Sequence, residues 1–224
     1  MHKYDIQLIA FDVDGTLVNA TIHIWQNLHN YFGCDAKRRE AAKQAHFAGK
    51  ISYQAWFEHD IQLLKEAGAS QSEIEKCLEQ LQPVNGARET LRTLQQRGYK
   101  LAIIPGSLDL VLHKFFADIS FDHVLINHFD FDAAGLLTGG VHTPYDIEGK
   151  AAGLRELARR EGLELRQCAF VGDNTNDLQA LEFAGFSVAV QAKNKRVEQA
   201  ADVIMSGDDL RALLRFFPPR PTTL

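Results

Sequence analysis

Two aspartates, Asp12 and Asp14, follow directly after an apolar run at residues 6–11. Such a run is typical of a buried strand, and open α/β sheets bind their ligands at the carboxyl edge of the strands. Burying two like charges this close together is costly unless a cation or catalysis requires them. One carboxylate can act as a nucleophile or metal ligand and the other as a general acid and base, while Gly15 allows a tight turn beneath them. We therefore interpret the pair as candidate catalytic residues.

A second apolar run, residues 168–172, also ends in acids, Asp173 and Asp177. These two lie four residues apart across a loop that turns into a predicted helix, so both can face one cavity. If the two strands are neighbours in the sheet, Asp173 converges with Asp12 and Asp14. An oxygen-rich cluster of this kind, with no Cys or His beside it, favours Mg²⁺.

A phosphoryl group bound at such a cluster would also need a positive side chain. Lys150, at the start of a predicted helix over 149–161, is the best-placed candidate. Lys100 and Lys114 fall at a strand entrance and inside a helix, which are poorer positions. Phosphoryl transfer depends mainly on positioning and on neutralisation of charge by a cation, a lysine and backbone donors. The sequence therefore predicts phosphoryl-transfer chemistry at this edge.

The elements that would hold these residues alternate between strands and helices. Apolar or β-branched segments predict strands at residues 6–12, 100–104, 122–127, 167–172, 186–190 and 202–205. Stretches of helical period lie at 86–97, 107–117, 149–161, 175–184, 194–200 and 208–216. This alternation favours the α/β class, with a doubly wound parallel sheet covered by helices on both faces.

Residues 20–84 break the alternation, because they contain several helical patterns and almost no strand-like run. We predict a catalytic core made of residues 1–19 and 85–224, with residues 20–84 inserted after the first strand as a helical cap domain. Residues 129–146 are rich in Gly and Asp and predict a small hairpin ahead of the helix at 149.

Composition excludes several classes of function. A net charge of −5 gives no support for nucleic-acid binding, and no run approaches the length of a membrane helix. The N-terminal residues lack the apolar region of a signal peptide, so we expect a cytoplasmic protein. The three cysteines are far apart and the nine histidines show no ligand spacing, which disfavours a disulfide framework or a zinc site. The oligomeric state is not indicated.

The motifs resemble those of the haloacid dehalogenase-like (HAD) hydrolase superfamily, in the branch similar to phosphoserine phosphatase. They occur in order at residues 12–16, 100–107, 150 and 172–177, so the resemblance spans nearly the whole chain. The resemblance implies a Rossmann-like core and attack by Asp12 on the phosphoryl group to form an aspartyl-phosphate. By the same resemblance, Asp14 first donates a proton to the leaving alcohol and then accepts a proton from the attacking water. It also implies Mg²⁺ held by Asp12, Asp173 and a backbone carbonyl at Asp14, with Lys150 stabilising the nucleophile and the phosphate.

The resemblance further implies that Asn176 contacts the phosphate and that Asp177 orders the site from behind. The second motif departs from the family. Its strand usually ends in Ser or Thr, which binds the phosphate, but here that position is Pro105, which has neither a hydroxyl nor an N–H. We expect the backbone N–H groups of Gly106 and Ser107, with the Ser107 hydroxyl as an option, to take over the contact.

The cap departs as well. Phosphoserine phosphatases carry an acid that holds the substrate ammonium and a cap arginine that holds its carboxylate, and the matching positions here are Thr21 and Asp60. Phe47, Tyr53 and Trp56 are further candidates for substrate contact, although cap aromatics are more often core residues. Because a carboxylate beside Asp60 would be repelled, we expect the substrate to be neutral or amine-bearing rather than phosphoserine.

We therefore expect a Mg²⁺-dependent phosphomonoester hydrolase acting on a small molecule. One alternative is a phosphate-accepting receiver domain, which the cap and the second aspartate of the first motif disfavour. Another is a phosphotransferase to an acceptor other than water, which the sequence does not separate from hydrolysis. The last is a catalytically silent ligand-binding module with the HAD fold, supported by Pro105 alone.

Overall fold

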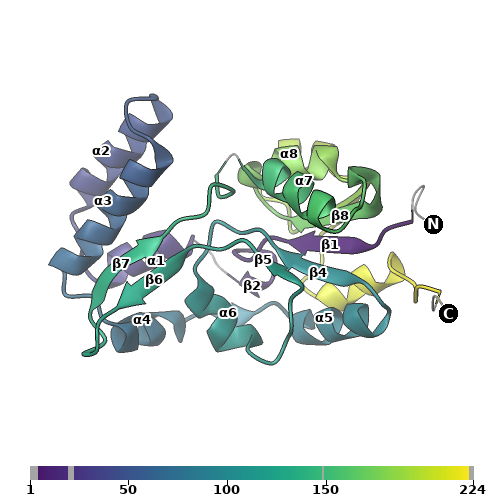
Figure 1. Cartoon of the computed structure of the whole chain (residues 1–224), viewed down its shortest axis with the longest axis horizontal. Coiled ribbons are helices and arrows are strands. Elements are labelled where there is room, and N and C mark those ends of the chain that lie inside the picture. The colour runs from purple at the N-terminus through teal and green to yellow at the C-terminus, as the bar shows by residue number, and fades with distance from the viewer. Residues whose placement is uncertain (1–4, 20–22, 148, 222–224) are drawn as a thin grey trace.

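The computed structural model describes residues 5–19, 23–147 and 149–221 (Figure 1). A six-stranded sheet forms its centre, in the order β10-β9-β8-β1-β4-β5, and every paired neighbour is parallel. The strands are β1 (Leu8–Phe11), β4 (Lys100–Ile103), β5 (His123–Val124), β8 (Cys168–Gly172), β9 (Phe186–Val190) and β10 (Val203–Met205). The predicted α/β class and its parallel sheet are confirmed.

Helices cover both faces of this sheet because side chains alternate along β1. Ile9 and Phe11 face a core that includes Leu91 and Leu112, whereas Leu8 faces a second core on the opposite side. The first core is covered by α5 (Ala87–Gln96), α6 (Asp109–Phe116) and the 3₁₀ segment η3 (Leu210–Arg215). The second is covered by α7 (Lys150–Arg160), α8 (Leu178–Phe183) and α9 (Lys195–Ala200), next to the 3₁₀ segments η1 (Leu165–Gln167) and η2 (Thr175–Asp177).

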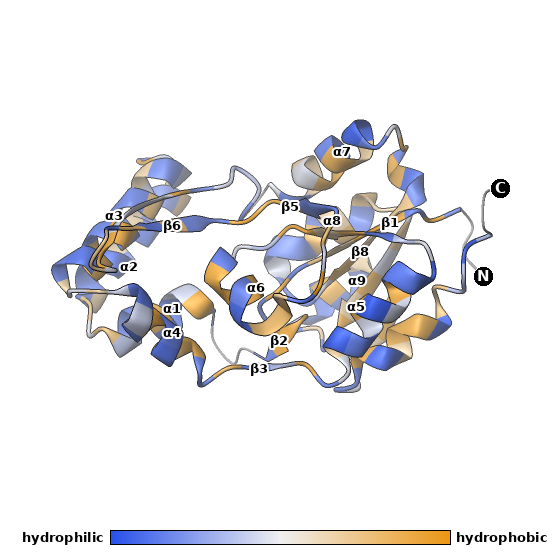
Figure 2. Ribbon diagram, turned by 60° about the horizontal axis from the view of Figure 1, so that its bottom comes forward, coloured by the Kyte–Doolittle hydropathy of each residue, from blue (hydrophilic) through white to orange (hydrophobic). Residues whose placement is uncertain are grey.

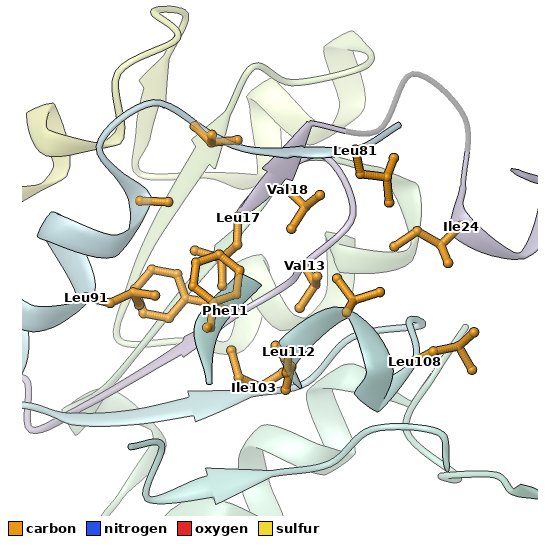
Figure 3. Packing of buried hydrophobic residues seen from close by; sticks show 14 of the residues in the cluster. Phe11, Val13, Leu17, Val18, Ile24, Leu81, Leu91, Ile103, Leu108 and Leu112 are labelled. Atoms are coloured by element: carbon orange, nitrogen blue, oxygen red, sulfur yellow. The ribbon is translucent and has the colours of Figure 1, made fainter. Parts of the chain in front are cut away.

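Figure 3 shows the first core from close by, with Phe11 lying among Leu17, Leu91 and Ile103. Full burial of these apolar side chains contributes about 1.5–3 kcal/mol each, which makes β1 a rigid base for the residues that follow it. Phe11 and Ile103 are paired in register across β1 and β4. The carboxyl end of β1 is therefore fixed on both sides before the chain reaches its first aspartate.

A block of four helices stands beside the sheet at one end of the molecule (Figures 1 and 2). Its members are α1 (Ile24–Tyr31), α2 (Ala36–Phe47), α3 (Tyr53–Glu66) and α4 (Gln71–Leu78). The chain passes between sheet and block through an antiparallel ribbon that the sequence did not predict, made of β2 (Val18–Asn19) and β3 (Gln82–Pro83). No helix among the described residues is both long enough and apolar enough to cross a membrane.

The predicted hairpin is present as β6 (His128–Phe131) and β7 (Leu137–Val141). It packs against the helical block, because the N–H of Leu137 donates to the Ala69 carbonyl at 2.9 Å and that of Gln71 donates to the Gly135 carbonyl at 2.8 Å. Figure 1 shows it beside α3. The division into a core and a cap at residues 20–84 stays a prediction, and the hairpin lies with the cap helices although it follows the core strands in sequence.

Candidate active site

The two acidic motifs meet at the carboxyl ends of β1 and β8, which are neighbouring strands. The N–H of Asp12 donates to the Val171 carbonyl at 2.9 Å and so continues the ladder between the two strands. Asp12, Asp173 and Asp177 each place one carboxylate oxygen within 4.8 Å of the others, and all three side chains are buried. The structure thus brings together the acids of the first and the fourth motif.

Lys150 lies within this cluster, at the first residue of α7. Its Nζ donates to Asp12 Oδ1 and to Asp177 Oδ1, each at 2.6 Å. The other oxygen of Asp177 accepts from the backbone N–H groups of Asp173 at 2.9 Å and Asn174 at 3.0 Å. Asp177 therefore orients the lysine and closes the loop that carries Asp173.

The buried charges shift one another's pKa. Burial raises the pKa of the Asp12 carboxyl well above its ordinary value, against the opposing effect of Lys150. Burial and the nearby Asp177 raise the pKa of Asp173 to about 7. Burial disfavours the Lys150 ammonium, but Asp12 and Asp177 outweigh it and raise the pKa of Lys150 above its ordinary value. Lys150 is therefore charged at neutral pH.

Asp14 is held separately from the cluster. Its Oδ2 accepts from the backbone N–H of Ile24, at the start of α1, at 3.0 Å, and its Oδ1 is buried with no hydrogen-bond partner among the described residues. Burial raises its pKa, and the Ile24 N–H opposes the rise. Ser107 lies beside it and also opposes the rise, without reaching a hydrogen bond of standard geometry. A carboxyl with a raised pKa is suited to donating a proton.

The acidic cluster fits a divalent cation. Asp173 Oδ2 is buried without a hydrogen-bond partner among the described residues, and the nearest ammonium facing it is that of the half-exposed Lys193, 3.7 Å away. Asp177 is a poorer ligand for a cation, because both of its carboxylate oxygens already accept hydrogen bonds. An all-oxygen donor set with excess negative charge suits Mg²⁺.

The second motif forms a loop next to these acids. Gly106 lines the same cavity as Asp12, and its carbonyl accepts from Trp25 Nε1 of α1 at 3.1 Å. The Ser107 hydroxyl is buried. Asn176 lines the cavity from the fourth motif. Of the residues expected to contact the phosphate, Gly106 and Asn176 therefore line the same cavity as Asp12.

A cavity of about 280 Å³ lies between the acidic cluster and the helical block. The core contributes Asp12, Asp14, Gly106, Asp146, Ile147, Asn174, Thr175 and Asn176 to its lining. The helical block and the residue before it contribute His23, Trp25, Gln26, Arg39, Lys43, Phe47, Tyr53, Trp56, Phe57 and Asp60. A cavity of this size admits a small molecule and no more.

Three of the aromatic candidates face this cavity. Phe47 stands at its rim and is 58% exposed, and Trp56 packs against it with ring centroids 5.8 Å apart. Tyr53 donates its hydroxyl proton to the buried Asp146, which also accepts from Asn127 at 3.2 Å. Sequence reasoning missed Asp146, because nothing near it in the chain marks it as a partner of residue 53. Thr21 lies outside the described residues.

Asp60 does not present the free negative charge on which the exclusion of phosphoserine depended. It is buried, and its Oδ2 accepts from Arg39 Nε of α2 at 3.1 Å. Neutralisation by Arg39 removes the repulsion that was expected for a substrate carboxylate. Arg39 and Lys43, which lie four residues apart on one face of α2 and line the cavity, were also missed.

Residues 6–185 match the family model of the haloacid dehalogenase-like hydrolases. The chain belongs to this family. It is 30% identical to a phosphoserine phosphatase of Methanocaldococcus jannaschii over 94% of this chain and 97% of that protein. It is 31% identical to the phosphoserine phosphatase SerB2 of Mycobacterium tuberculosis, covering 93% of this chain but only 49% of that protein. The resemblance inferred from the four motifs is confirmed.

The structure agrees with this assignment. It superposes with a TM-score of 0.73 on a phospho-aspartyl intermediate analogue of phosphoserine phosphatase, which is 27% identical, over 96% of this chain and all of the other. The expectation that phosphoserine is not the substrate has no support in these comparisons. Together with the pairing of Asp60 and Arg39, the names of these relatives count against it.

Proposed function

We propose that the chain is a Mg²⁺-dependent phosphomonoester hydrolase that works through an aspartyl-phosphate on Asp12. The observation that carries the proposal is the placement of Lys150, which joins Asp12 and Asp177 by two 2.6 Å contacts inside a buried acidic cluster. Two comparisons support the proposal: the chain belongs to the haloacid dehalogenase-like hydrolases, and its fold is similar to that of a phospho-aspartyl intermediate analogue of phosphoserine phosphatase. Asp12 is the nucleophile because Lys150 engages only Oδ1 and leaves Oδ2 for attack.

The reaction has two steps. Asp12 Oδ2 bonds to phosphorus, the bond to the ester oxygen breaks, and protonated Asp14 gives its proton to the leaving alkoxide. Asp14, now a carboxylate, takes a proton from water as that water attacks phosphorus, and the bond to Asp12 breaks to release inorganic phosphate. The raised pKa of Asp14 suits both roles, because the group must be protonated first and ionised afterwards.

The remaining residues bind and neutralise charge. Asp12, Asp173 and the backbone carbonyl of Asp14 would hold Mg²⁺, which supplies positive charge beside the phosphate oxygens when bound. Lys150 balances the charge on the nucleophile and the phosphate. The N–H groups of Gly106 and Ser107, which follow Pro105, donate to the phosphate oxygens, with Asn176 opposite. Backbone donors need no hydroxyl at residue 105, so the departure in the second motif is compatible with catalysis.

The substrate is a small phosphomonoester, because the cavity holds about 280 Å³ and the helical block lines one side of it. Phosphoserine is among the candidates, since the relatives carry that name and Asp60 is neutralised by Arg39. The prediction of a cytoplasmic location, made from the N-terminal sequence, is retained as part of this proposal.

The proposal is tested with a panel of phosphomonoesters, including phosphoserine and a generic aryl phosphate, assayed with Mg²⁺ and after chelation. Release of inorganic phosphate that requires Mg²⁺ is expected. Transfer of the phosphoryl group to an added alcohol in preference to water would instead identify a phosphotransferase. No turnover of any ester, with phosphorylated Asp12 persisting, would indicate a receiver-like role.

A further inference from the structure

Two side chains of the helical block reach the phosphate loop, residues 104–108 between β4 and α6, by separate routes. Trp25 of α1 reaches it directly, because its Nε1 donates to the Gly106 carbonyl at 3.1 Å. Tyr53, the first residue of α3, reaches it through Asp146, to which it donates its hydroxyl proton. Asp146 lies in the segment between β7 and α7, and its other oxygen, Oδ1, lies against Gly106.

Asp146 lies so close to Gly106 that a side chain at residue 106 would not fit. A Cβ built on Gly106 would overlap Asp146 Oδ1. The backbone of Gly106 is not in the left-handed region, so the close approach of the carboxylate, and not a turn, requires the glycine. Because protein interiors are close-packed, Asp146 blocks movement of the loop in its direction. The place of Gly106 therefore depends on where Asp146 is held.

Asp146 is itself held through Oδ2, by one donor from the helical block and one from the core. Tyr53 is the first donor, and Asn127 Nδ2, at 3.2 Å, is the second. Asn127 is fully buried, and its Oδ1 accepts from the Thr143 N–H at 2.8 Å. Its backbone carbonyl accepts from the N–H of Asp109, directly after the phosphate loop, at 3.0 Å. The core half of this network is thus rigid, and the Tyr53 hydroxyl is the half that the helical block supplies.

We propose that Asp146 is a positioning residue, which holds Gly106 in place for phosphate binding and is itself held by the Tyr53 hydroxyl. The inference rests on the proposed function, in which the N–H groups of Gly106 and Ser107 bind the phosphate, and it names what fixes those donors. Donors that are fixed before the reaction stabilise the charge of the transition state without having to reorganise. The hydroxyl therefore acts on the phosphate through Asp146, and not by contact with the alcohol part of the substrate.

The first test removes the hydroxyl and keeps the ring, in Tyr53→Phe. It uses two esters that the wild type hydrolyses and that differ in their alcohol part, such as ethyl phosphate and phosphoserine. kcat/KM should fall by about 10- to 100-fold, and by the same factor for both esters, because the phosphate is common to them. The inhibition constant of inorganic phosphate, which has no alcohol part, should rise. A fall for one ester only, with unchanged inhibition by phosphate, would overturn the inference and make Tyr53 a contact of the alcohol part.

Tyr31→Phe is the matched control. Tyr31 of α1 also donates its hydroxyl to a carboxylate, Glu73 Oε2 at 2.9 Å, but it does not belong to the cavity lining. This variant should keep the wild-type kcat/KM for both esters. Equal losses in Tyr31→Phe and Tyr53→Phe would show that a general loosening of the helical block is responsible, which would contradict the role given to Asp146.

The second test separates the position of Asp146 from its charge. Asp146→Asn keeps an oxygen for Tyr53 and Asn127 but removes the negative charge, whereas Asp146→Ala removes both. Asp146→Asn should retain most of the wild-type kcat/KM, and Asp146→Ala should lose at least as much as Tyr53→Phe. The losses should be partial, because Trp25 still contacts the Gly106 carbonyl in every variant. Equal losses in the two Asp146 variants would assign the effect to the charge and refute a positioning role.

A double variant shows whether the hydroxyl acts only through Asp146. Tyr53→Phe combined with Asp146→Ala should lose no more kcat/KM than Asp146→Ala alone, since the two changes break one network. A loss equal to the product of the single losses would mean that the hydroxyl contacts the phosphate itself, and the inference would fail. Wild-type turnover that Tyr53→Phe leaves unchanged would overturn the inference alone. No turnover of any phosphomonoester by the wild type with Mg²⁺ would overturn the proposed function and this inference with it.

Discussion

Asp173 occupies the space that a side chain at residue 15 would need. A Cβ built on Gly15 would lie 2.3 Å from Asp173 Oδ2, and the backbone at Gly15 has φ of +96°. Because Gly15 has no side chain, Asp173 of the fourth motif can lie close to the first motif and to Asp12. One glycine couples two motifs that lie more than 150 residues apart in sequence.

Gly15→Ala should abolish activity and the response to Mg²⁺. The positive φ alone costs about 1–3 kcal/mol for a residue with a Cβ, and the methyl group would also push Asp173 away. Gly135→Ala is the matched control, because Gly135 has φ of +79° but nothing within 4 Å of a built Cβ. It should lower Tm without changing kcat/KM. Equal effects of the two variants on activity would show that backbone strain, and not the place of Asp173, is responsible.

Asp12→Asn should lower kcat by at least about 10³-fold, because the amide keeps the shape but cannot act as the nucleophile. Asp14→Asn should slow both formation and hydrolysis of the phosphoenzyme, since one group serves as acid and as base. Single-turnover kinetics separate the two steps. Asp130→Asn, an exposed acid in the hairpin, is the control and should behave as the wild type. Near-normal turnover by Asp12→Asn would contradict the mechanism.

Lys150→Ala should cost on the order of 10²-fold or more in kcat/KM, because it removes the charge beside the nucleophile. Ser107→Ala should cost about tenfold or less if backbone N–H groups hold the phosphate. Circular dichroism must accompany the Lys150 measurement, since the change leaves buried Asp12 and Asp177 without their cation. A larger loss at Ser107 than at Lys150 would show that the hydroxyl makes the main phosphate contact.

Stabilisation by Mg²⁺ should increase with pH. Without metal, burial raises the pKa of Asp173 to about 7, and those of Asp12 and Asp14 are also raised. In the unfolded chain these groups titrate near about 4, so the folded state binds more protons between about pH 4 and pH 7 and loses stability as pH rises through that window.

Mg²⁺ requires the ionised carboxylates and should reverse this loss. Tm of the metal-free protein should fall between pH 5 and pH 8, and the increase in Tm on adding Mg²⁺ should be larger at pH 8. Asp173→Asn should show a smaller fall in Tm, because the pKa values of Asp12 and Asp14 are also raised, and little increase in Tm on adding Mg²⁺. The same increase in Tm at both pH values would contradict the pKa shifts given above.

The sequence predicted the parts of the site that depend on strand ends. Asp12 and Asp173 each follow an apolar run, and two such runs in a parallel sheet bring their acids to one edge. Lys150 could be placed because it begins a periodic helix. These are local patterns, and the topology of an α/β sheet converts them into proximity.

Side-chain contacts between one element and another could not be predicted in the same way. The Arg39–Asp60 pair joins α2 to α3, and Tyr53 joins α3 to a core loop at Asp146. Their formation depends on how the helices pack, and no periodicity in the chain encodes that. Interpreting Asp60 in isolation therefore left out the positive charge of Arg39 that is paired with it.

The hairpin of β6 and β7 has a consequence for exchanging parts between relatives. Phe129 and Leu137 of the hairpin are buried, and Trp25 of α1 packs edge-on against Phe129 with ring centroids 5.4 Å apart. The helical block that lines the cavity is thus packed against a second, separate stretch of chain. Transplanting residues 20–84 alone would set a foreign helical block against a native hairpin and leave mismatched apolar surfaces between them. A chimera that keeps this packing would have to carry both stretches, so the helical block and the hairpin are one unit for exchange and not two.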